Sequence, residues 1–290
     1  MFGDDFHAAR IRTSGAEIHF VHGGFGPALL LLHGYPQTHL IWRDVAPRLA
    51  RDFHVICPDL RGYGDSSKPP TTPDHSPYSK RAMARDMVEV MASLGYSAFF
   101  VAGHDRGARV AHRMALDYPE RIGRACVMDI APTHHMFKTT DQRFATAYYH
   151  WFFLIQPDGL PEHLIGADPA YYLTERLKRG SAPGAVFADA SVAEYIRCFS
   201  EPETIHASCE DYRAAASIDL EHDEEDRHKR VTCPLLILWG SKGFVGRAYD
   251  VLEVWRERAE QVEGRALDCG HFLPEEASTA VYGELLRFLG

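Results

Sequence analysis

The fold is decided by one stretch of sequence, Phe99-Phe-Val-Ala-Gly-His-Asp-Arg-Gly-Ala-Arg-Val-Ala111, in which a short apolar run passes through a turn directly into a helical pattern. Its centre, Gly103-His-Asp-Arg-Gly107, has the G-x-S-x-G spacing of a nucleophile elbow, with aspartate in the serine position. The two glycines allow a tight turn and close packing of helix on strand, so the side chain of Asp105 should project into a pocket. An aspartate that only caps the helix N-terminus would show the same spacing, so the rest of the chain must decide.

Short apolar runs recur on both sides of this stretch and predict strands that are buried on both faces. They cover Ala28–Leu32, His54–Cys57, Ala98–Ala102, Arg124–Met128 and Pro234–Trp239. Helical patterns cover Ile41–Arg51, Ser79–Leu94, Gly107–Asp117, Val245–Glu260 and Glu276–Leu289. Strands that alternate with helices predict a parallel sheet with crossover helices. Before them, Arg10–Thr13 and Glu17–Val21 predict a β-hairpin.

This alternation stops after about Thr133, where aromatic and helix-forming residues dominate, and resumes at Val231. We therefore expect a core domain of residues 1–132 and 231–290, into which residues 133–230 are inserted as a helical cap domain. The fold class that this order predicts is the α/β-hydrolase fold: a mostly parallel central sheet with helices on both faces and an inserted helical cap.

The composition excludes several classes of function. The formal net charge of −9 argues against a nucleic-acid partner, although it permits a small anionic substrate. No apolar stretch is long enough to span a membrane, and the acidic opening Met1-Phe-Gly-Asp-Asp-Phe-His7 does not resemble a signal peptide, so we expect no membrane partner. The six cysteines include no C-x-x-C pair, which favours reduced thiols in a cytoplasmic protein.

Two further motifs lie where a nucleophile elbow needs them. His33-Gly-Tyr-Pro36 follows the first long buried strand and predicts a loop whose backbone N–H, together with that of Arg106, forms an oxyanion hole. Cys269-Gly-His-Phe272 places His271 on a loop just before the last helix, where this fold carries its general base.

The acid that orients His271 needs a separate argument. Many enzymes of this fold carry it after the strand that here ends at Trp239, but Gly240–Val245 contains no carboxylate. One strand after the nucleophile, Met128-Asp-Ile-Ala-Pro132 does contain one, so we assign Asp129 to this role. The weaker candidates are Asp250 and Asp268.

An aspartate nucleophile restricts the chemistry. A serine that attacked saturated carbon would form an ether, whereas a carboxylate forms an ester that water can hydrolyse. Asp105 therefore predicts displacement at carbon, after which His271 activates a water that attacks the ester carbonyl. Carbon–halogen bonds and epoxides are the two substrate classes that satisfy this logic. The pair His134-His135 lacks a third ligand at a recognisable spacing, so we expect no metal and no cofactor.

Nearly the whole chain resembles the haloacetate (fluoroacetate) dehalogenases. The likeness is carried by Gly103-His-Asp-Arg-Gly-Ala-Arg109, Met128-Asp-Ile-Ala-Pro132, Tyr149-His-Trp-Phe-Phe-Leu-Ile-Gln-Pro157 and Asp211-Tyr-Arg-Ala214. The resemblance implies a homodimer that converts fluoroacetate or chloroacetate to glycolate and halide. It also implies that Arg106 and Arg109 bind the substrate carboxylate. The halide pocket that it implies consists of His150, Trp151 and Tyr212.

The residue types agree with these implied roles. Arg106 and Arg109 are three residues apart at a helix start, and their guanidinium forks suit a carboxylate, although Arg109 could instead pair with an acid of the protein. Fluoride is small and strongly hydrated, so only convergent donors can replace its water. His150, Trp151 and Tyr212 offer an imidazole, an indole and a phenol. For Trp151 alone, packing of an aromatic cap on the core explains the residue as well.

Two alternative functions stay open. Epoxide hydrolases share the H-G-x-P loop, the aspartate elbow and a cap tyrosine, but commonly carry tryptophan where this chain has Arg106. The cap could supply their second tyrosine donor from Tyr148, Tyr149, Tyr171, Tyr172 or Tyr195. Tyr35 also departs from the dehalogenases, in which phenylalanine is more usual, and adds a hydroxyl near the pocket. The second alternative is a non-catalytic ligand receptor. Halide release from haloacetates would exclude it.

Overall fold

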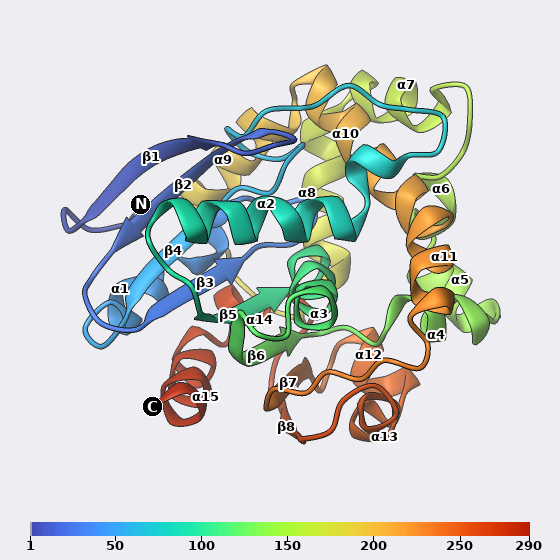
Figure 1. The fold of residues 1–290 in the computed structure, drawn as a ribbon. Helices are drawn as coiled ribbons and strands as arrows, with labels where there is room; N and C mark the ends of the chain where they lie inside the picture. The colour runs from blue at the N-terminus through green and yellow to red at the C-terminus, as the bar shows by residue number, and fades with distance from the viewer. Residues whose placement is uncertain (1) are drawn as a thin grey trace.

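The centre of the fold is one mixed sheet, shown in Figure 1 for residues 2–290, the part of the chain that the computed structural model describes. Its eight strands follow the order β1-β2-β4-β3-β5-β6-β7-β8. Their bounds are β1 Phe6–Arg12, β2 Glu17–Gly23, β3 Ala28–Leu32, β4 His54–Pro58, β5 Phe99–His104, β6 Ile122–Met128, β7 Leu235–Gly240 and β8 Val262–Leu267. Strand β2 pairs antiparallel with β1 and β4, and every other pairing in the sheet is parallel. The predicted hairpin and the predicted parallel sheet are both confirmed.

Helices cover both faces of this sheet. The helices outside the inserted segment are η1 His39–Trp42, α1 Ala46–Leu49, η2 Ser76–Tyr78, α2 Lys80–Ser93, α3 Arg106–Asp117, α12 Phe244–Ala248, α13 Val251–Arg256, α14 Leu273–Glu276 and α15 Ser278–Leu289. Neighbouring side chains of a strand point to opposite faces. Accordingly, Leu30 and Leu32 of β3 belong to one hydrophobic cluster with residues of α2 and α3. Leu29 and Leu31 belong to a second cluster with residues of α1 and α15.

One predicted helix is interrupted. We expected a single helix over Val245–Glu260, but the chain forms α12 and α13 with a break at Tyr249, whose backbone is extended (φ −128°, ψ 148°). Asp250 then starts the second helix, because its side chain accepts a hydrogen bond from the backbone N–H of Glu253. A capping aspartate of this kind can restart a helix within a continuous apolar pattern.

Between β6 and β7 the described chain forms helices and no strand. These helices are α4 Thr133–Lys138, α5 Gln142–Ala147, α6 His150–Phe153, α7 Leu160–Ala167, α8 Pro169–Gly180, α9 Asp189–Phe199, α10 Pro202–Ala215 and α11 Ile218–Glu225. They meet the sheet at the carboxyl end of β5, because Arg106, which opens α3, bonds to Asp211 of α10. The division into a core and a cap at residues 133 and 230 stays a prediction.

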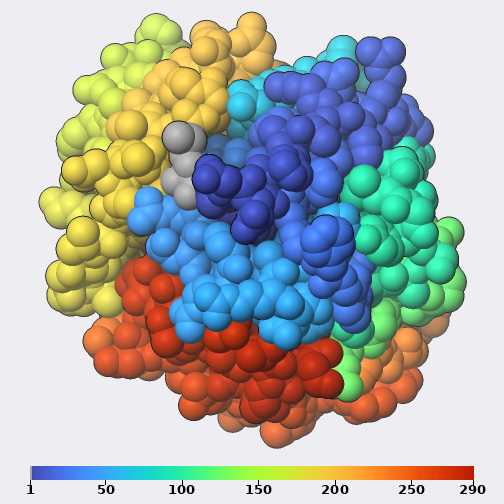
Figure 2. All heavy atoms as spheres, turned by 90° about the vertical axis from the view of Figure 1, so that its left-hand side faces the viewer, coloured from blue at the N-terminus to red at the C-terminus, as the bar shows by residue number. Residues whose placement is uncertain are grey.

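The inserted helices pack directly on the N-terminal half of the chain. In Figure 2 they (yellow-green to gold) border the N-terminal segments (blue), with the C-terminal segment (red) along the opposite side. Arg197 of α9 forms an ion pair with Asp65, and Arg43 bonds to Ser191. All six cysteines are free thiols, as we expected, and five of them are buried. No helix within residues 2–290 is long and apolar enough to cross a membrane.

Candidate active site

Asp105 lies in a sharp turn between β5 and α3. Its backbone has a positive φ (47°, with ψ −113°), a conformation that costs a side-chain-bearing residue about 1–3 kcal/mol and persists only where the surroundings enforce it. Both elbow glycines are needed for close approach. A Cβ at Gly103 would lie 2.4 Å from the carbonyl oxygen of Gly107, and one at Gly107 would lie 2.3 Å from that of His33. The sequence therefore forces this turn and presents Asp105 from it.

The predicted oxyanion loop contacts the Asp105 carboxylate. The backbone N–H of Tyr35 donates to Asp105 Oδ2 at 3.0 Å. A Cβ at Gly34 would lie 2.6 Å from Asp105 Cβ, so only glycine lets the loop approach this closely. Arg106 is the first residue of α3, where backbone N–H groups have no partner within the helix. The loop and the helix start together can thus stabilise negative charge on an oxygen of residue 105.

The imidazole of His271 lies between two carboxylates, those of Asp129 and Asp105. His271 Nδ1 lies 2.6 Å from Asp129 Oδ2, and its Nε2 lies 4.0 Å from Asp105 Oδ1. Asp129 is held in place because its Oδ1 accepts the backbone N–H of Gly240 at 2.9 Å. A gap of 4.0 Å is too long for a hydrogen bond, so the imidazole faces the nucleophile without binding it tightly.

Asp250 and Asp268, the two weaker candidates for the acid that orients His271, have other partners in the structure. Asp250 caps α13, as described above. Asp268 is largely exposed and forms a surface ion pair with Lys242. Among the three carboxylates, Asp129 is the one that bonds to His271.

Burial and the neighbouring charges shift the pKa values of His271 and Asp105 in opposite directions. Burial by itself lowers the pKa of His271, but the hydrogen bond to Asp129 and the charges of Asp129 and Asp105 outweigh it and raise the pKa above 6.5. Burial raises the pKa of Asp105, but the positive charges of His271, Arg106 and Arg109 outweigh it and lower the pKa below 3.8. Asp105 is therefore ionised at neutral pH, as a nucleophile must be.

A pH dependence follows from the pKa of His271. Only neutral imidazole can accept a proton from water, so hydrolysis of an ester should speed up as pH rises through this pKa. Because the pKa is raised, we expect the acid limb of the kcat profile to have its midpoint above pH 6.5. A profile of kcat between pH 5 and 9 in buffers of constant ionic strength measures it, and a midpoint well below pH 6.5 would contradict the account.

The two arginines predicted to bind carboxylate lie behind the pocket wall. Arg106 is saturated on one side by Asp211, to which Nε and Nη2 donate at 2.9 and 2.6 Å, while Nη1 is buried without a protein partner. Arg109 donates to Ala131 O and Thr133 Oγ1, and its Nε is likewise buried without a partner. Each guanidinium thus keeps one nitrogen whose N–H groups have no partner within the described protein.

The three residues predicted to bind halide meet at one cavity. It has a volume of about 350 Å³, and Asp105 and His271 line it together with His150, Trp151 and Tyr212. The rings of Tyr212 and His150 are 5.6 Å apart and those of Tyr212 and Trp151 are 6.3 Å apart. The structure therefore brings these three side chains to the nucleophile, which spacing in the sequence could not show.

The two arginines contact two of the residues that are predicted to bind halide. The guanidinium of Arg106 stacks over the ring of Tyr212 at 4.3 Å, and that of Arg109 over Trp151 at 4.8 Å. Neither arginine lines the cavity itself. The sequence analysis missed three arginines that do line it: Arg176 and Arg179 of α8, and Arg247 of α12. Arg176 lies outside every motif considered, so no signal in the sequence marked it.

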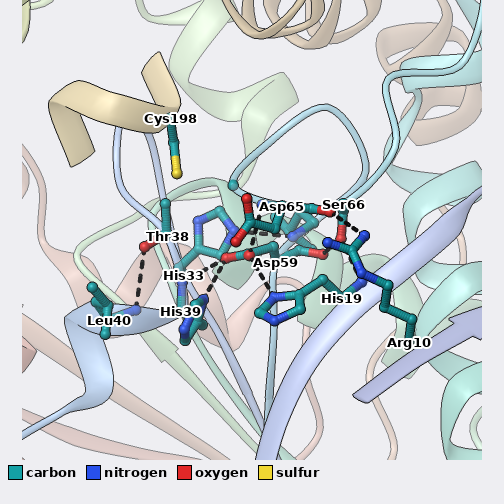
Figure 3. Close-up of polar contacts among 12 residues, drawn as sticks. Arg10, His19, His33, Thr38, His39, Leu40, Asp59, Asp65, Ser66 and Cys198 are labelled. Carbon is teal, nitrogen blue, oxygen red and sulfur yellow. Dashed lines mark hydrogen bonds and ion pairs between the residues drawn. The ribbon is translucent and has the colours of Figure 1, made fainter. Parts of the chain in front are cut away.

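A buried polar cluster gathers around Asp59 and includes His33, the first residue of the predicted oxyanion loop (Figure 3). Asp59 accepts hydrogen bonds from the backbone N–H groups of His39 and Asp65 and lies within 3.0 Å of the imidazole Nδ1 of His19 and His39. Next to it, His33 accepts the backbone N–H of Leu60 through Nε2. Two histidines and a carboxylate are a possible metal-ligand set, but each oxygen of Asp59 already has two partners, so we assign this cluster a structural role.

The chain is similar over most of its length to several known proteins. The model of the alpha/beta hydrolase fold family matches residues 27–278. A fluoroacetate dehalogenase from Burkholderia sp is 45% identical over 93% of this chain and 89% of its own length. A soluble epoxide hydrolase from Corynebacterium sp. (strain C12) is 38% identical over 97% of this chain and 96% of its own length. A crystal structure of a protein from Nostoc sp PCC 7120, described as an alpha/beta hydrolase, has a TM-score of 0.97 at 60% identity, with 98% of each chain covered.

The chain therefore belongs to the α/β-hydrolase fold family and is a hydrolase, which confirms the predicted fold class. Within that family it is similar to a fluoroacetate dehalogenase and, at lower identity, to epoxide hydrolases.

Proposed function

We propose that this hydrolase is a haloacetate dehalogenase. In the first step a carboxylate oxygen of Asp105 attacks the halogen-bearing carbon of a haloacetate, the carbon–halogen bond breaks, and the halide leaves with the bonding electrons. The product of this step is a carboxymethyl ester of Asp105. In the second step His271 takes a proton from water, and the hydroxide attacks the ester carbonyl of residue 105. The acyl–oxygen bond then breaks, one proton of the water ends on the hydroxyl oxygen of the departing glycolate, and the other passes through His271 to solvent, so that Asp105 returns to its carboxylate form. The N–H groups of Tyr35 and Arg106 stabilise the oxyanion that forms in between.

The observation that carries this proposal is the aspartate at the elbow. Its side chain is ionised, contacts the Tyr35 N–H at 3.0 Å and faces His271 Nε2 at 4.0 Å. The buried free N–H groups of Arg106 and Arg109 favour an anionic substrate, because an unpaired buried donor is costly unless a ligand completes it. The similarity to a fluoroacetate dehalogenase over 93% of the chain supports the same substrate class.

Halide release tests this function directly. The purified protein should release fluoride from fluoroacetate and chloride from chloroacetate, with glycolate formed in equal amount. The same preparation should be offered small epoxides, with diol formation as the readout. Diol without halide would replace the proposal with an epoxide hydrolase, and the absence of both reactions would favour a non-catalytic ligand receptor.

A specific feature keeps epoxide hydrolysis as the second candidate. Tyr148 and Tyr212 are two of the four tyrosines that line the cavity with Asp105, and phenol donors are what a reaction needs to protonate the oxygen of an opening epoxide ring. Burial raises the pKa of both, so each keeps its proton at neutral pH. The anionic substrate that the arginines favour is the reason we place the haloacetate first.

Trp151 gives a test of the leaving-group site. Phenylalanine keeps an aromatic ring there but removes the indole N–H. We expect Trp151→Phe to lower kcat for fluoroacetate by about tenfold, because a lost hydrogen bond to a charged group costs about 1.5–3 kcal/mol. The loss for chloroacetate should be smaller, since chloride depends less on donated hydrogen bonds. Equal losses for the two substrates would count against a halide pocket at this residue.

The homodimer, the cytoplasmic location and the absence of a cofactor belong to this proposal as predictions. The reaction as written uses side chains and backbone N–H groups of this chain, together with water.

A further inference from the structure

Arg176 is a buried cation without a carboxylate partner. It is 7% exposed and lines the same cavity as Asp105, His150 and His271. None of the ion pairs among the described residues includes it, and its Nε is buried without a hydrogen-bond partner. Arg106, by contrast, has its charge balanced by Asp211. A guanidinium that is out of water and has no acid beside it is costly, which points to an anion that binds near it during function.

Among residues 2–290, the one hydrogen bond that the side chain of Arg176 forms is with the imidazole of His150. Arg176 Nη2 lies 3.4 Å from His150 Nε2. A guanidinium can only donate, so Nε2 must be the bare, accepting nitrogen of the ring, and the proton of neutral His150 must be on Nδ1. That Nδ1 is buried and has no partner within the protein. Arg176 thereby leaves His150 with one free N–H donor in the region of the active-site cavity.

The charge of Arg176 also keeps the ring of His150 neutral. Burial lowers the pKa of His150 well below 6.5, and the positive charges of Arg176, His271 and Arg106 lower it further. A neutral imidazole with a fixed tautomer is a donor that needs no proton uptake before it can bind an anion.

We propose that Arg176 is a positioning residue for the leaving halide: it fixes His150 as an Nδ1–H donor at the site where the halide departs. This inference rests on the proposed dehalogenase function and extends it to a residue that no sequence motif marked. The family resemblance supplied the halide role of His150, and the contact of 3.4 Å supplies the role of Arg176.

A double-mutant cycle separates action through His150 from a general structural effect. The four proteins are the wild type, Arg176→Met, His150→Gln and the double variant. We expect Arg176→Met to lower kcat for fluoroacetate by about tenfold or more, since it removes a charge-assisted hydrogen bond. Because both residues serve one donor, the double variant should be no more than about twofold slower than His150→Gln. Effects of the two substitutions that multiply would overturn the inference.

Two further measurements complete the design. Inhibition by added bromide should weaken about tenfold in Arg176→Met, whereas a fault in folding alone would lower the active fraction and leave the inhibition constant unchanged. Arg176→Lys, which keeps a charged N–H donor, should recover part of the loss. Lys178→Met is the matched control: it removes a cation from the same helix at a largely exposed position and should leave both kcat and bromide inhibition unchanged.

The outcomes also separate a failure of the proposed role of Arg176 from a failure of the proposed dehalogenase function. If the wild type releases no halide from any haloacetate, both the dehalogenase proposal and the role of Arg176 are wrong. If it releases halide but Arg176→Met matches the wild type in kcat and bromide inhibition, only the role of Arg176 is wrong.

Discussion

Asp105→Asn should reduce kcat for every haloacetate by about 10⁴-fold or more. An uncharged amide is a very poor nucleophile toward saturated carbon, so the ester cannot form. The fold should survive the change. Asparagine tolerates a positive φ such as the 47° found here, and its side-chain oxygen can still accept the N–H of Tyr35. Halide release at saturating substrate gives kcat, and urea unfolding shows whether the variant is folded.

The same substitution at Asp268 is the control for this experiment. Asp268 has a largely exposed side chain paired with Lys242, so Asp268→Asn should keep wild-type turnover. A folded Asp105→Asn protein that retained more than about one tenth of the wild-type kcat would exclude a carboxylate nucleophile at this residue.

His271→Asn should stop the reaction halfway. Attack by Asp105 needs no base, so one equivalent of halide should still be released per active site. Hydrolysis of the ester does need a base, and without it this step should slow by about 10²–10⁴-fold. The enzyme should therefore accumulate as the carboxymethyl ester. Mass spectrometry of the peptide that contains residue 105 should show the added carboxymethyl group.

The double variant Asp105→Asn/His271→Asn is the control, and it should neither release the burst of halide nor gain the added mass. Normal steady-state turnover by His271→Asn would show that another group acts as the base.

The sequence predicted the elements whose signals are local. The apolar runs that became β3, β5, β6 and β7 are buried on both faces, so their composition shows them directly. Strand β8 gave no such signal, because it lies at the edge of the sheet and its side chains over Val262–Leu267 are mostly exposed or half-buried. The break between α12 and α13 was missed because one capping aspartate, Asp250, interrupts an otherwise continuous helical pattern.

Some residues of the candidate site could likewise be predicted from the sequence, and others could not. Asp105 and His271 were predicted from motifs, since glycine spacing and chain order are properties of the sequence. The assignment of Asp129 needed elimination among several acids, and its contact of 2.6 Å with His271 could be seen only in the folded chain. Arg176 could not be predicted at all, because its significance depends on a contact across 26 residues and on its having no ion pair with any carboxylate within residues 2–290.

The central claim, a covalent ester on Asp105, can be tested by a single turnover in heavy-oxygen water with enzyme in excess over fluoroacetate. Water attacks the carbonyl carbon of the ester, so the account predicts that heavy oxygen enters the side-chain carboxylate of residue 105 and that the first glycolate released carries the original, unlabelled oxygen. Heavy oxygen in the glycolate hydroxyl, with none in the peptide that contains Asp105, would show that water attacks the substrate directly and would contradict the account.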